Sequence, residues 1–490
     1  MDHLFASMAD FLADFWPHVA AATVVVVSIL AAAHAVLHKR DSRAAIGWVG
    51  VIWLSPPMGA ILYYLFGINR IQRRAKLLRG GEDFYELPPT PHAVSDTMFG
   101  EKLGEAASRF RPLVSLVGVL AEHPLVYGNR VQPLLGGDDA FPAMLAAIDS
   151  AQRSISLESY IFDNDRAGRQ FAEALGRAVK RGVEVRVLID SVGSRYSLPS
   201  IVPRLRRLNV HTARFMRTYV PTSLAYTNLR SHRKILVADG RIGFTGGLNI
   251  REGAMLNLNP RAPLHDTHFR FEGPVVAHLQ KVFAEDWVFT TGEVLQGDHW
   301  FPQLDVAGDV LSRGIPNGPD EDLGEMRTTL IGALTCAQER VVIMTPYFLP
   351  DDALAEALNV AALRGVQVDI ILPAANNLAL VKWASTAMLF QVLERGCRVW
   401  LSAPPFDHTK LMLVDDVWTL LGSANWDPRS LRLNFEFNVE CYDRALAAEL
   451  NKLVARRLVS ARPVTLADVD GRAFLVRIRD GIARLFSPYL

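Results

Sequence analysis

Two long apolar runs open the chain. The first covers residues 19–37 and the second residues 44–68, and neither contains Asp, Glu, Lys or Arg. Each run is long enough to cross the roughly 30 Å hydrocarbon core of a bilayer as a helix, which satisfies its own backbone polar groups. Pro56 and Pro57 interrupt the second run and are expected to kink it. The pattern predicts an N-terminal transmembrane helical hairpin over residues 1–70, or a second segment that turns back within the bilayer.

A cleaved signal peptide is the alternative for the first run, because the small-residue sequence AAAHA lies near its end. The region before the run is acidic instead of basic, and a second apolar run follows, so we favour a retained anchor. The basic residues after each run do not fix the orientation by themselves. We expect a multi-pass protein of the cell (inner) membrane with its catalytic body in the cytoplasm.

Further along, short β-rich runs alternate with amphipathic helical runs. Residues 154–190 have the pattern of a strand, a helix and a second strand, and residues 340–373 repeat that order. Strand–helix–strand units of this kind are typical of α/β folds. We therefore predict two similar α/β units, at residues 125–295 and 320–460.

The remaining residues form a connecting region and a tail. Residues 71–124 have the pattern of a basic, loop-rich linker. Residues 461–490 mix apolar and Arg positions at helical spacing, which is compatible with an amphipathic helix. Such a tail either packs on the body or lies on a membrane surface. We favour packing on the body.

One motif, His-x-Lys-x4-Asp, occurs once in each α/β unit. Each copy is followed by a pair of small residues and an Asn, and the two copies keep a constant offset, since 408 − 232 and 425 − 249 both equal 176. A single copy would more often be a surface hairpin, whereas a duplicated copy indicates a functional unit. The candidate catalytic residues are His232, Lys234, Asp239, His408, Lys410 and Asp415.

The motif suggests chemistry at phosphorus. Side chains two residues apart share one face of a strand, so each His lies beside its Lys. Two copies facing each other would surround a phosphate with imidazole and ammonium groups. Imidazole titrates near neutral pH, so one ring can attack phosphorus while the other protonates the leaving alkoxide. The roles then reverse, which gives double displacement through a phosphohistidine without a metal or a cofactor.

Small and amide side chains beside the motif complete a candidate phosphate site. The small pair allows a backbone to approach a ligand closely, and the Asn residues add donors. These candidates are Gly247, Asn249, Ser423 and Asn425. The chain also places Glu158, Tyr160 and Tyr347 on predicted strands, where they either line the site or are half-buried strand residues.

A nucleophilic His needs an acceptor on its other ring nitrogen. Asp239 and Asp415 lie seven residues along the strand from the imidazoles (239 − 232 = 415 − 408 = 7), so we expect them to hold the hairpin by hydrogen bonds. Asp266 and Glu436 each lie on a predicted strand that follows a motif copy. We predict that these two carboxylates orient the histidines.

Charge and cysteine content narrow the class of function. The chain has 52 Lys and Arg against 51 Asp and Glu, so its net charge of +1 gives no general attraction to nucleic acid. The three cysteines form no C-x-x-C pair and indicate neither a disulfide framework nor a zinc site. His265 and His268 would point to opposite faces of a strand, so we expect no metal site there.

The doubled motif resembles that of the phospholipase D superfamily, and the surrounding residues are more closely similar to bacterial cardiolipin synthases. The segments that carry this resemblance are SHRKILVADGRIGFTGGLNI, HDTHFRFEGP, HTKLMLVDD and LLGSANWDPRSLRLNFEFN, together with the N-terminal apolar pair and the ARLFSP of the tail. It covers nearly the whole chain. One departure is LRSHRK, where the family would place Asn before the His.

The resemblance implies two phospholipase D-like α/β units packed as a pseudo-symmetric catalytic body behind the membrane hairpin. It implies a phosphatidyltransferase that joins two phosphatidylglycerol molecules into cardiolipin and releases glycerol. In that reaction His232 is the nucleophile and His408 the acid and base, an order that the symmetry of the motif does not decide. The expected partners are phosphatidylglycerol, other membrane phospholipids and the bilayer, and not nucleic acid.

Four alternatives stay open. The same phosphohistidine would serve a phospholipase D-type hydrolase that uses water, or a transferase that uses another alcohol. Nucleic-acid phosphodiesterases share the superfamily, although the charge balance and the apolar runs oppose that function. The fourth alternative, an inactive membrane scaffold, is opposed by the two intact motif copies.

Overall fold

The computed structural model describes residues 2–39, 42–67, 85, 91–121, 123–216, 229–319 and 324–487, with the side chains of residues 2–14, 43 and 66 excepted. Contacts divide the chain into an N-terminal unit, up to residue 77, and a body that contains the remaining elements.

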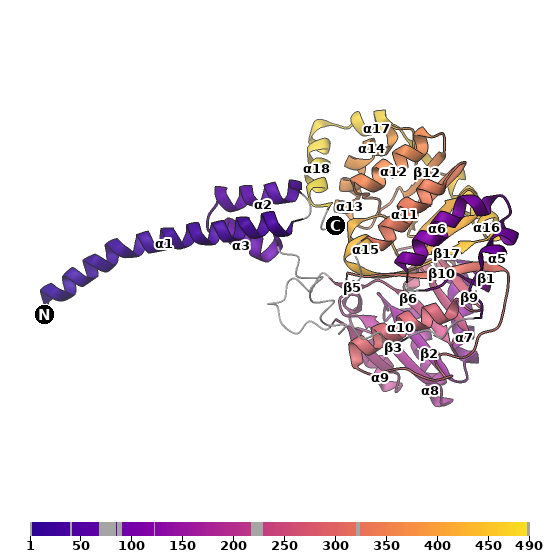
Figure 1. Ribbon diagram of the computed structural model, residues 1–490. Helices are drawn as coiled ribbons and strands as arrows, with labels where there is room; N and C mark the ends of the chain where they lie inside the picture. The colour runs from indigo at the N-terminus through magenta and orange to yellow at the C-terminus, as the bar shows by residue number, and fades with distance from the viewer. Residues whose placement is uncertain are drawn as a thin grey trace. The chain divides into compact units, whose positions relative to one another are not determined.

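The N-terminal unit is helical (Figure 1). It consists of α1 (Asp2–His38), α2 (Ser42–Leu54), α3 (Met58–Leu62) and the π-helix η1 (Tyr63–Gly67). Residues Phe15–His38 of α1 are long and apolar enough to cross a membrane. Ala35, Ile52 and Tyr63 pack together in a small buried cluster, so α2 and η1 fold back against α1.

The second apolar run is not one continuous helix. α2 ends at Leu54, and residues 55–57 form a bend and a turn, since Pro57 lacks a backbone N–H to continue the helix. At 13 residues, α2 is about 20 Å long, short of the roughly 30 Å of a hydrocarbon core. The kink is as predicted, but the described helices include only one candidate span, not the two expected.

The body contains two repeats of one α/β unit. The first repeat has β1 (Val126–Leu135), α7 (Gly136–Ser150), β2 (Ser154–Ser159), α8 (Arg166–Lys180), β3 (Glu184–Asp190), α9 (Val202–Arg207), β4 (His211–Phe215), β5 (Arg230–Ser231), β6 (Lys234–Ala238), β7 (Ile242–Gly246), β8 (Leu264–His265), β9 (Thr267–Glu272) and α10 (Val276–Thr291), with short 3₁₀ turns at Gly193–Arg195, Glu252–Ala254 and Leu256–Leu258.

The second repeat has the matching elements. They are β10 (Val310–Asn317), α11 (Glu325–Cys336), β11 (Arg340–Met344), α12 (Asp352–Leu363), β12 (Gln367–Pro373), α13 (Ala379–Met388), α14 (Phe390–Leu393), β13 (Arg398–Ser402), β14 (Phe406–Asp407), β15 (Leu411–Val414), β16 (Trp418–Gly422), α15 (Pro428–Arg432), β17 (Asn434–Tyr442) and α16 (Arg444–Val459). The tail adds β18 (Arg462–Val464), α17 (Leu466–Asp470) and α18 (Phe474–Leu485).

Strand order shows the duplication directly. The first repeat runs β1-β9-β7-β6-β2-β3-β4, and the second runs β10-β17-β16-β15-β11-β12-β13, with β18 at its edge. In both repeats the last three strands of this series are mutually parallel and the others are antiparallel. The two halves join through antiparallel pairing of β1 with β10. The predicted pair of α/β units is therefore confirmed.

The matched helices α8 and α12 begin and end in the same way. An Asp caps each start, since Asp165 accepts a hydrogen bond from the Gly168 N–H and Asp351 accepts one from the Leu354 N–H. A Gly with positive φ follows each helix, 89° at Gly182 and 92° at Gly365, and turns the chain into the next strand. The caps and glycines therefore fix where each helix gives way to the next parallel strand.

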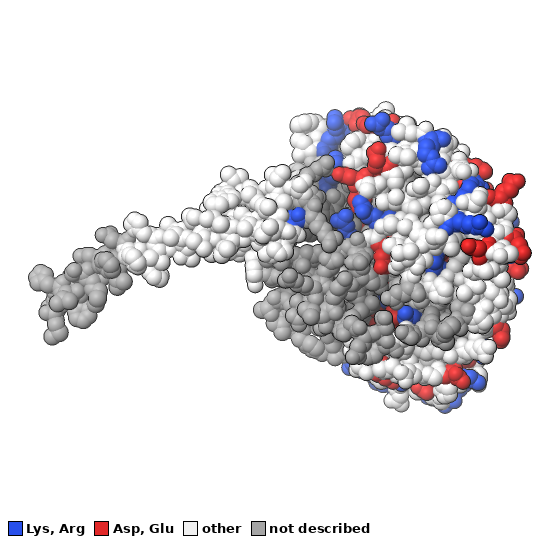
Figure 2. All heavy atoms as spheres, viewed as in Figure 1, with Lys and Arg blue, Asp and Glu red and all other residues white. Residues whose placement is uncertain are grey.

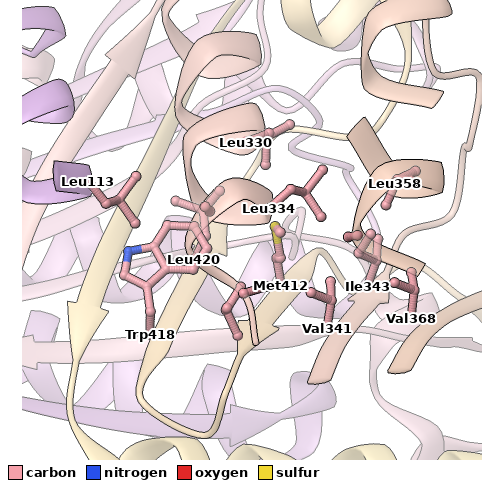
Figure 3. Packing of buried hydrophobic residues seen from close by; sticks show 14 of the residues in the cluster. Leu113, Leu330, Leu334, Val341, Ile343, Leu358, Val368, Met412, Trp418 and Leu420 are labelled. Carbon is pink, nitrogen blue, oxygen red and sulfur yellow. The ribbon is translucent and has the colours of Figure 1, made fainter. Parts of the chain in front are cut away.

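Three buried clusters define the layers of the body. One lies between the first half-sheet and α7 and α8, and a second lies between the other half-sheet and α11 and α12. Figure 3 shows the second cluster, where Leu330 and Leu334 of α11 pack over Trp418, Leu420 and neighbouring strand residues. In the third cluster, α10 and α16 share contacts with strands of both repeats. Helices therefore cover both faces of each half-sheet.

Part of the predicted linker belongs to the body. Residues 96–120, expected to be loop-rich, form α5 (Asp96–Leu103) and α6 (Ala106–Leu120). Phe99 and Phe110 are buried in the core of the second repeat, and Leu113 lies at its edge in Figure 3. The linker prediction was wrong here because the apolar positions of this segment recur at helical spacing and bury against α11.

Candidate active site

The two motif histidines meet inside one chain. His232 lies just before β6 and His408 just before β15, and their ring centroids are 6.5 Å apart with an interplanar angle of 82°. Each segment is fixed to the opposite repeat through its backbone: the His232 N–H donates to the Phe435 carbonyl at 2.8 Å, and the His408 N–H donates to the His265 carbonyl at 2.7 Å. One small space therefore receives a ring from each repeat.

The carboxylates that hold the rings are exchanged between the repeats. Glu436 lies 2.9 Å from Nδ1 of His232, and Asp266 lies 2.8 Å from Nδ1 of His408. Each acid follows one motif copy in sequence but contacts the histidine of the other copy. Because Nδ1 is occupied in both rings, Nε2 is the nitrogen that remains for substrate.

Burial favours the neutral form of both imidazoles. Burial first, and then the Lys410 ammonium, lower the pKa of His408 to about 3, against the opposing effect of Asp266. The pKa of His232 is also lowered well below its usual value, first by burial and then by the charges of Lys234 and Lys410. A neutral imidazole is the form that can attack phosphorus.

The two motif lysines lie behind the rings. Lys234 Nζ donates to the His232 carbonyl and Lys410 Nζ to the His408 carbonyl, both at 2.5 Å. Burial lowers the pKa of Lys234 to about 7 and that of Lys410 to about 8. The positive charges of both lysines act on both rings, since they lower the pKa of His232 and of His408.

The motif aspartates do not reach the imidazoles. Asp239 accepts hydrogen bonds from the backbone N–H groups of Gln152, Arg153 and Ser154, at the end of β6 remote from Lys234. Asp415 accepts them from residues 338–340 in the matching place. Both aspartates therefore fix the start of the neighbouring strand, and the structure gives them no contact with the reacting groups.

The predicted phosphate-binding residues fall into two pairs. Asn249 and Asn425 line the cavity beside the histidines. Gly247 lies behind them, where a Cβ atom would come within 2.1 Å of Asp266 Oδ1, so the glycine makes room for the carboxylate and not for a ligand. Ser423 is fully buried and exchanges hydrogen bonds with the backbone of Phe437, next to Glu436.

The histidines open into a cavity of about 780 Å³. Tyr160 and Tyr347 line it symmetrically, with ring centroids 5.1 Å from His232 and 6.3 Å from His408. Glu158 is buried behind the wall, where it accepts a hydrogen bond from Ser231. Of these three strand residues, Tyr160 and Tyr347 line the cavity, whereas Glu158 is a buried strand residue.

Sequence reasoning missed the arginines of this cavity. Arg230, Arg251 and Arg429 all contribute to its wall. Arg230 Nη1 donates to the Tyr160 hydroxyl at 3.1 Å, and burial together with the charge of Arg230 lowers the pKa of Arg429. Arg230 and Arg429 each lie within a few residues of a motif, in LRSHRK and NWDPRS, which is the signal that could have found them. Two guanidinium groups held near each other favour a bound anion.

Comparison with known proteins agrees with this geometry. The family described as "Cardiolipin synthase, PLD-like domain" matches residues 144–287 and 330–458, and that described as "Phospholipase_D-nuclease N-terminal" matches residues 26–67. A "Cardiolipin synthase" of Geobacillus kaustophilus is 33% identical over 93% of this chain and 90% of its own. The "Major cardiolipin synthase ClsA" of Bacillus subtilis is 32% identical over 92% of this chain and 95% of its own.

A solved structure shows the same fold. The crystal structure of phosphatidylserine synthase from Haemophilus influenzae covers 77% of this chain and 100% of its own, with a TM-score of 0.60 and 15% sequence identity. At that identity the match supports the architecture alone. The family match over both repeats, the full-length relatives and the convergence of the two histidines agree: this chain belongs to the cardiolipin synthase family of phospholipase D-like enzymes.

Proposed function

We propose that this enzyme makes cardiolipin from two phosphatidylglycerol molecules and releases glycerol. One observation carries the proposal: two neutral imidazoles, each held at Nδ1 by a carboxylate of the other repeat, face a single cavity. That arrangement supplies a nucleophile and a proton carrier for double displacement at phosphorus. The names of the full-length relatives support the choice of substrate.

In the first step Nε2 of His232 attacks the phosphorus of one phosphatidylglycerol. A P–N bond forms, the P–O bond to the headgroup glycerol breaks, and His408 gives its Nε2 proton to the leaving alkoxide. His408 is neutral at rest, but the negative charge of a bound phosphodiester raises the pKa of a nearby imidazole and favours its protonation. Lys234, Lys410, Asn249 and Asn425 stabilise the charge on the phosphoryl oxygens.

The second step uses the same groups in reverse. His408, now neutral, takes the proton from a terminal hydroxyl of the second phosphatidylglycerol as that oxygen attacks phosphorus. The P–N bond breaks, His232 returns to its neutral state, and cardiolipin leaves. The proton that His408 takes from the acceptor hydroxyl replaces the one it gave to glycerol, so no net acid, base or cofactor is consumed.

The arginine pair supports transfer to a lipid over hydrolysis. An acceptor phosphatidylglycerol carries a second phosphodiester, which must lie near the reacting phosphorus. Arg230 and Arg429 supply bidentate donors in the same cavity as the histidines, and 780 Å³ is within the range of roughly 300–1,000 Å³ of ligand sites. We propose that these arginines bind the phosphodiester of the acceptor.

We further propose the arrangement of the chain in the membrane. The acidic segment before the first apolar run would lie outside, and the basic residues after it would lie in the cytoplasm together with the body. The short α2 and the break after Leu54 suit a segment that turns back within the bilayer instead of crossing it. A cysteine introduced at Val459, which is 88% exposed on the body, should react with a membrane-impermeant reagent only after the cells are permeabilised. Reaction in intact cells would show that the body lies outside, opposite to the proposed orientation.

Product analysis tests the function. Purified full-length protein given phosphatidylglycerol should yield cardiolipin and glycerol in equal amounts, and His232→Ala should yield neither while it still fractionates with membranes. Phosphatidic acid without cardiolipin would instead identify a hydrolase. Cardiolipin made at the normal rate by His232→Ala would remove this residue from the mechanism.

A further inference from the structure

The C-terminal helix α18 (Phe474–Leu485) exposes an apolar face. Phe474, Leu475 and Leu485 are 74%, 76% and 75% exposed, and Ile478, Ile482 and Phe486 are between 43% and 53% exposed. At 100° per residue these six positions fall within one arc of about 120°. A contiguous face of large apolar side chains in water is costly and marks an interaction surface.

The opposite face of α18 packs on the body, and it is the more polar one. Asp480 and Ala483 are buried, and Asp480 pairs with Arg472 and Arg479. Ala483 belongs to a cluster with Val381 and Met388 of α13. Since the apolar side chains are exposed and lie outside that contact, the packing of α18 on the body does not explain them.

Basic side chains border the apolar face. By the same helical spacing, Arg477 lies along one edge of the face and Arg479 along the other. Arg479 also stacks on Trp383 at 4.4 Å, which fixes its place. In Figure 2, Lys and Arg atoms lie among uncharged atoms in the part of the body where Figure 1 places α18. An apolar face edged by arginines matches the acyl and anionic headgroup layers of a membrane.

The mouth of the cavity lies at the start of the helix against which α18 packs. The start of α13, residues Leu378–Val381, lines the cavity, and α18 packs along the same helix. Leu378 and Leu380 are 46% and 40% exposed there. Acyl chains leaving a bilayer beside α18 would therefore meet the apolar side chains of Leu378 and Leu380 at the mouth.

We propose that α18 docks the body onto the bilayer surface, with the side chains of Phe474, Leu475, Ile478, Ile482, Leu485 and Phe486 among the lipids. This contact is separate from the N-terminal anchor and brings the cavity mouth to the lipid interface. This proposal depends on the proposed function in one respect only, namely the reason why the docking helix lies near the cavity.

A double variant, Leu475→Ser with Ile482→Ser, tests the contribution to turnover in the full-length protein. Loss of two inserted apolar side chains should lower turnover of phosphatidylglycerol in vesicles by on the order of tenfold. Turnover of monomeric short-chain phosphatidylglycerol should be unchanged. The control, Leu198→Ser with Val459→Ser, removes two side chains that are 89% and 88% exposed elsewhere on the body and should change neither rate. Equal vesicle turnover of both variants would overturn the proposal.

Nitroxide labels test the contact without reference to turnover. Labels at Leu475→Cys and Leu485→Cys, in a Cys336→Ser background, should collide with oxygen dissolved in lipid and not with a water-soluble nickel complex. A label at Val459→Cys should do the opposite. This result would stand even if no cardiolipin were formed, so the two proposals fail separately.

Three other outcomes would contradict the proposal that α18 docks on the bilayer. Access of the nickel complex to residues 475 and 485 would place the face in water. If protection of these labels from the nickel complex increased with the density of protein in the vesicle, the face would be assigned to a contact with a second copy of the chain. Cross-linking of Leu475→Cys to the N-terminal unit of the same chain would assign it to that unit.

Discussion

At the scale of single residues, each catalytic ring depends on a carboxylate from the other repeat. Glu436 contacts His232 and Asp266 contacts His408, and both acids are buried. A buried acceptor at Nδ1 fixes the tautomer and stabilises the imidazolium that forms during proton transfer. We therefore expect a change of the acid in one half of the chain to impair the ring of the other half.

Asp266→Asn should therefore lower kcat by roughly 10²–10⁴-fold with little change in KM, because the amide cannot stabilise a protonated His408. Steady-state kinetics with phosphatidylglycerol measures this. Asp305→Asn, which changes an aspartate that is 91% exposed, is the control and should behave as the parent. Similar kcat values for Asp266→Asn and its parent would exclude the positioning role.

The lowered pKa values of the two motif lysines predict how the activity depends on pH. The pKa of Lys234 is lowered to about 7 and that of Lys410 to about 8, so both ammonium groups lose their protons as pH rises through this interval. Activity should fall across it, measured as the pH profile of kcat/KM. In Lys410→Arg the charge at this position persists, so the decline attributed to Lys410 near pH 8 should disappear from the residual activity. A profile with the same decline near pH 8 would contradict this assignment.

The same shifts affect stability with the opposite sign. A lysine whose folded pKa is below its unfolded value of 10.5 binds fewer protons in the folded protein. The unfolded chain then binds more protons between about pH 7 and 10.5, so the contribution of these two groups to folding stability increases as pH rises. A loss of activity between pH 7 and 8 would therefore not reflect unfolding, and circular dichroism on the same samples should show no loss of structure.

At the scale of elements, α6 illustrates a helix whose role depends on its neighbour. Phe110 is fully buried between α6 and the second repeat, whereas Val119 on the same helix is 87% exposed. Phe110→Ala should reduce the free energy of unfolding by about 3–5 kcal/mol, because it removes buried apolar surface and leaves a cavity. Val119→Ala should change it by less than about 0.5 kcal/mol. Denaturant unfolding of the full-length protein in detergent, followed by tryptophan fluorescence, compares the two; equal effects would mean that α6 is not part of the core.

At the scale of the whole molecule, the cavity belongs to both repeats at once. Arg230 comes from the first and Arg429 from the second, as do the two histidines. A single repeat would therefore present half of the catalytic groups. The duplicated chain gives the enzyme a site whose two sides differ in detail, which suits a reaction with a donor lipid and an acceptor lipid.

This asymmetry gives a prediction about product choice. Arg429→Gln should weaken binding of the acceptor phosphodiester and lower the ratio of cardiolipin to phosphatidic acid by about tenfold at low phosphatidylglycerol. Transfer to dissolved ethanol, an acceptor without a phosphate, should be unchanged. Arg432→Gln is the control, since that side chain is 51% exposed and pairs with Asp351. An unaltered product ratio would remove Arg429 from acceptor binding.

The sequence by itself determined the histidines, lysines and carboxylates of the site, although not its arginines, and the repeat that carries them. Local spacing is enough for this: a two-residue period puts His and Lys on one strand face, a constant offset reveals duplication, and an apolar run predicts a membrane helix. The break at Pro56 and Pro57 could also be predicted, because it depends only on the geometry of proline.

Only the tertiary structure decided which groups meet. The exchange of Asp266 and Glu436 between repeats, the burial of α5 and α6, and the approach of Arg230 to Arg429 all depend on contacts between residues distant in sequence. Periodicity describes one element at a time and does not say which other element covers its face. The direction of the apolar face of α18, away from α13, was decided in the same way, by packing.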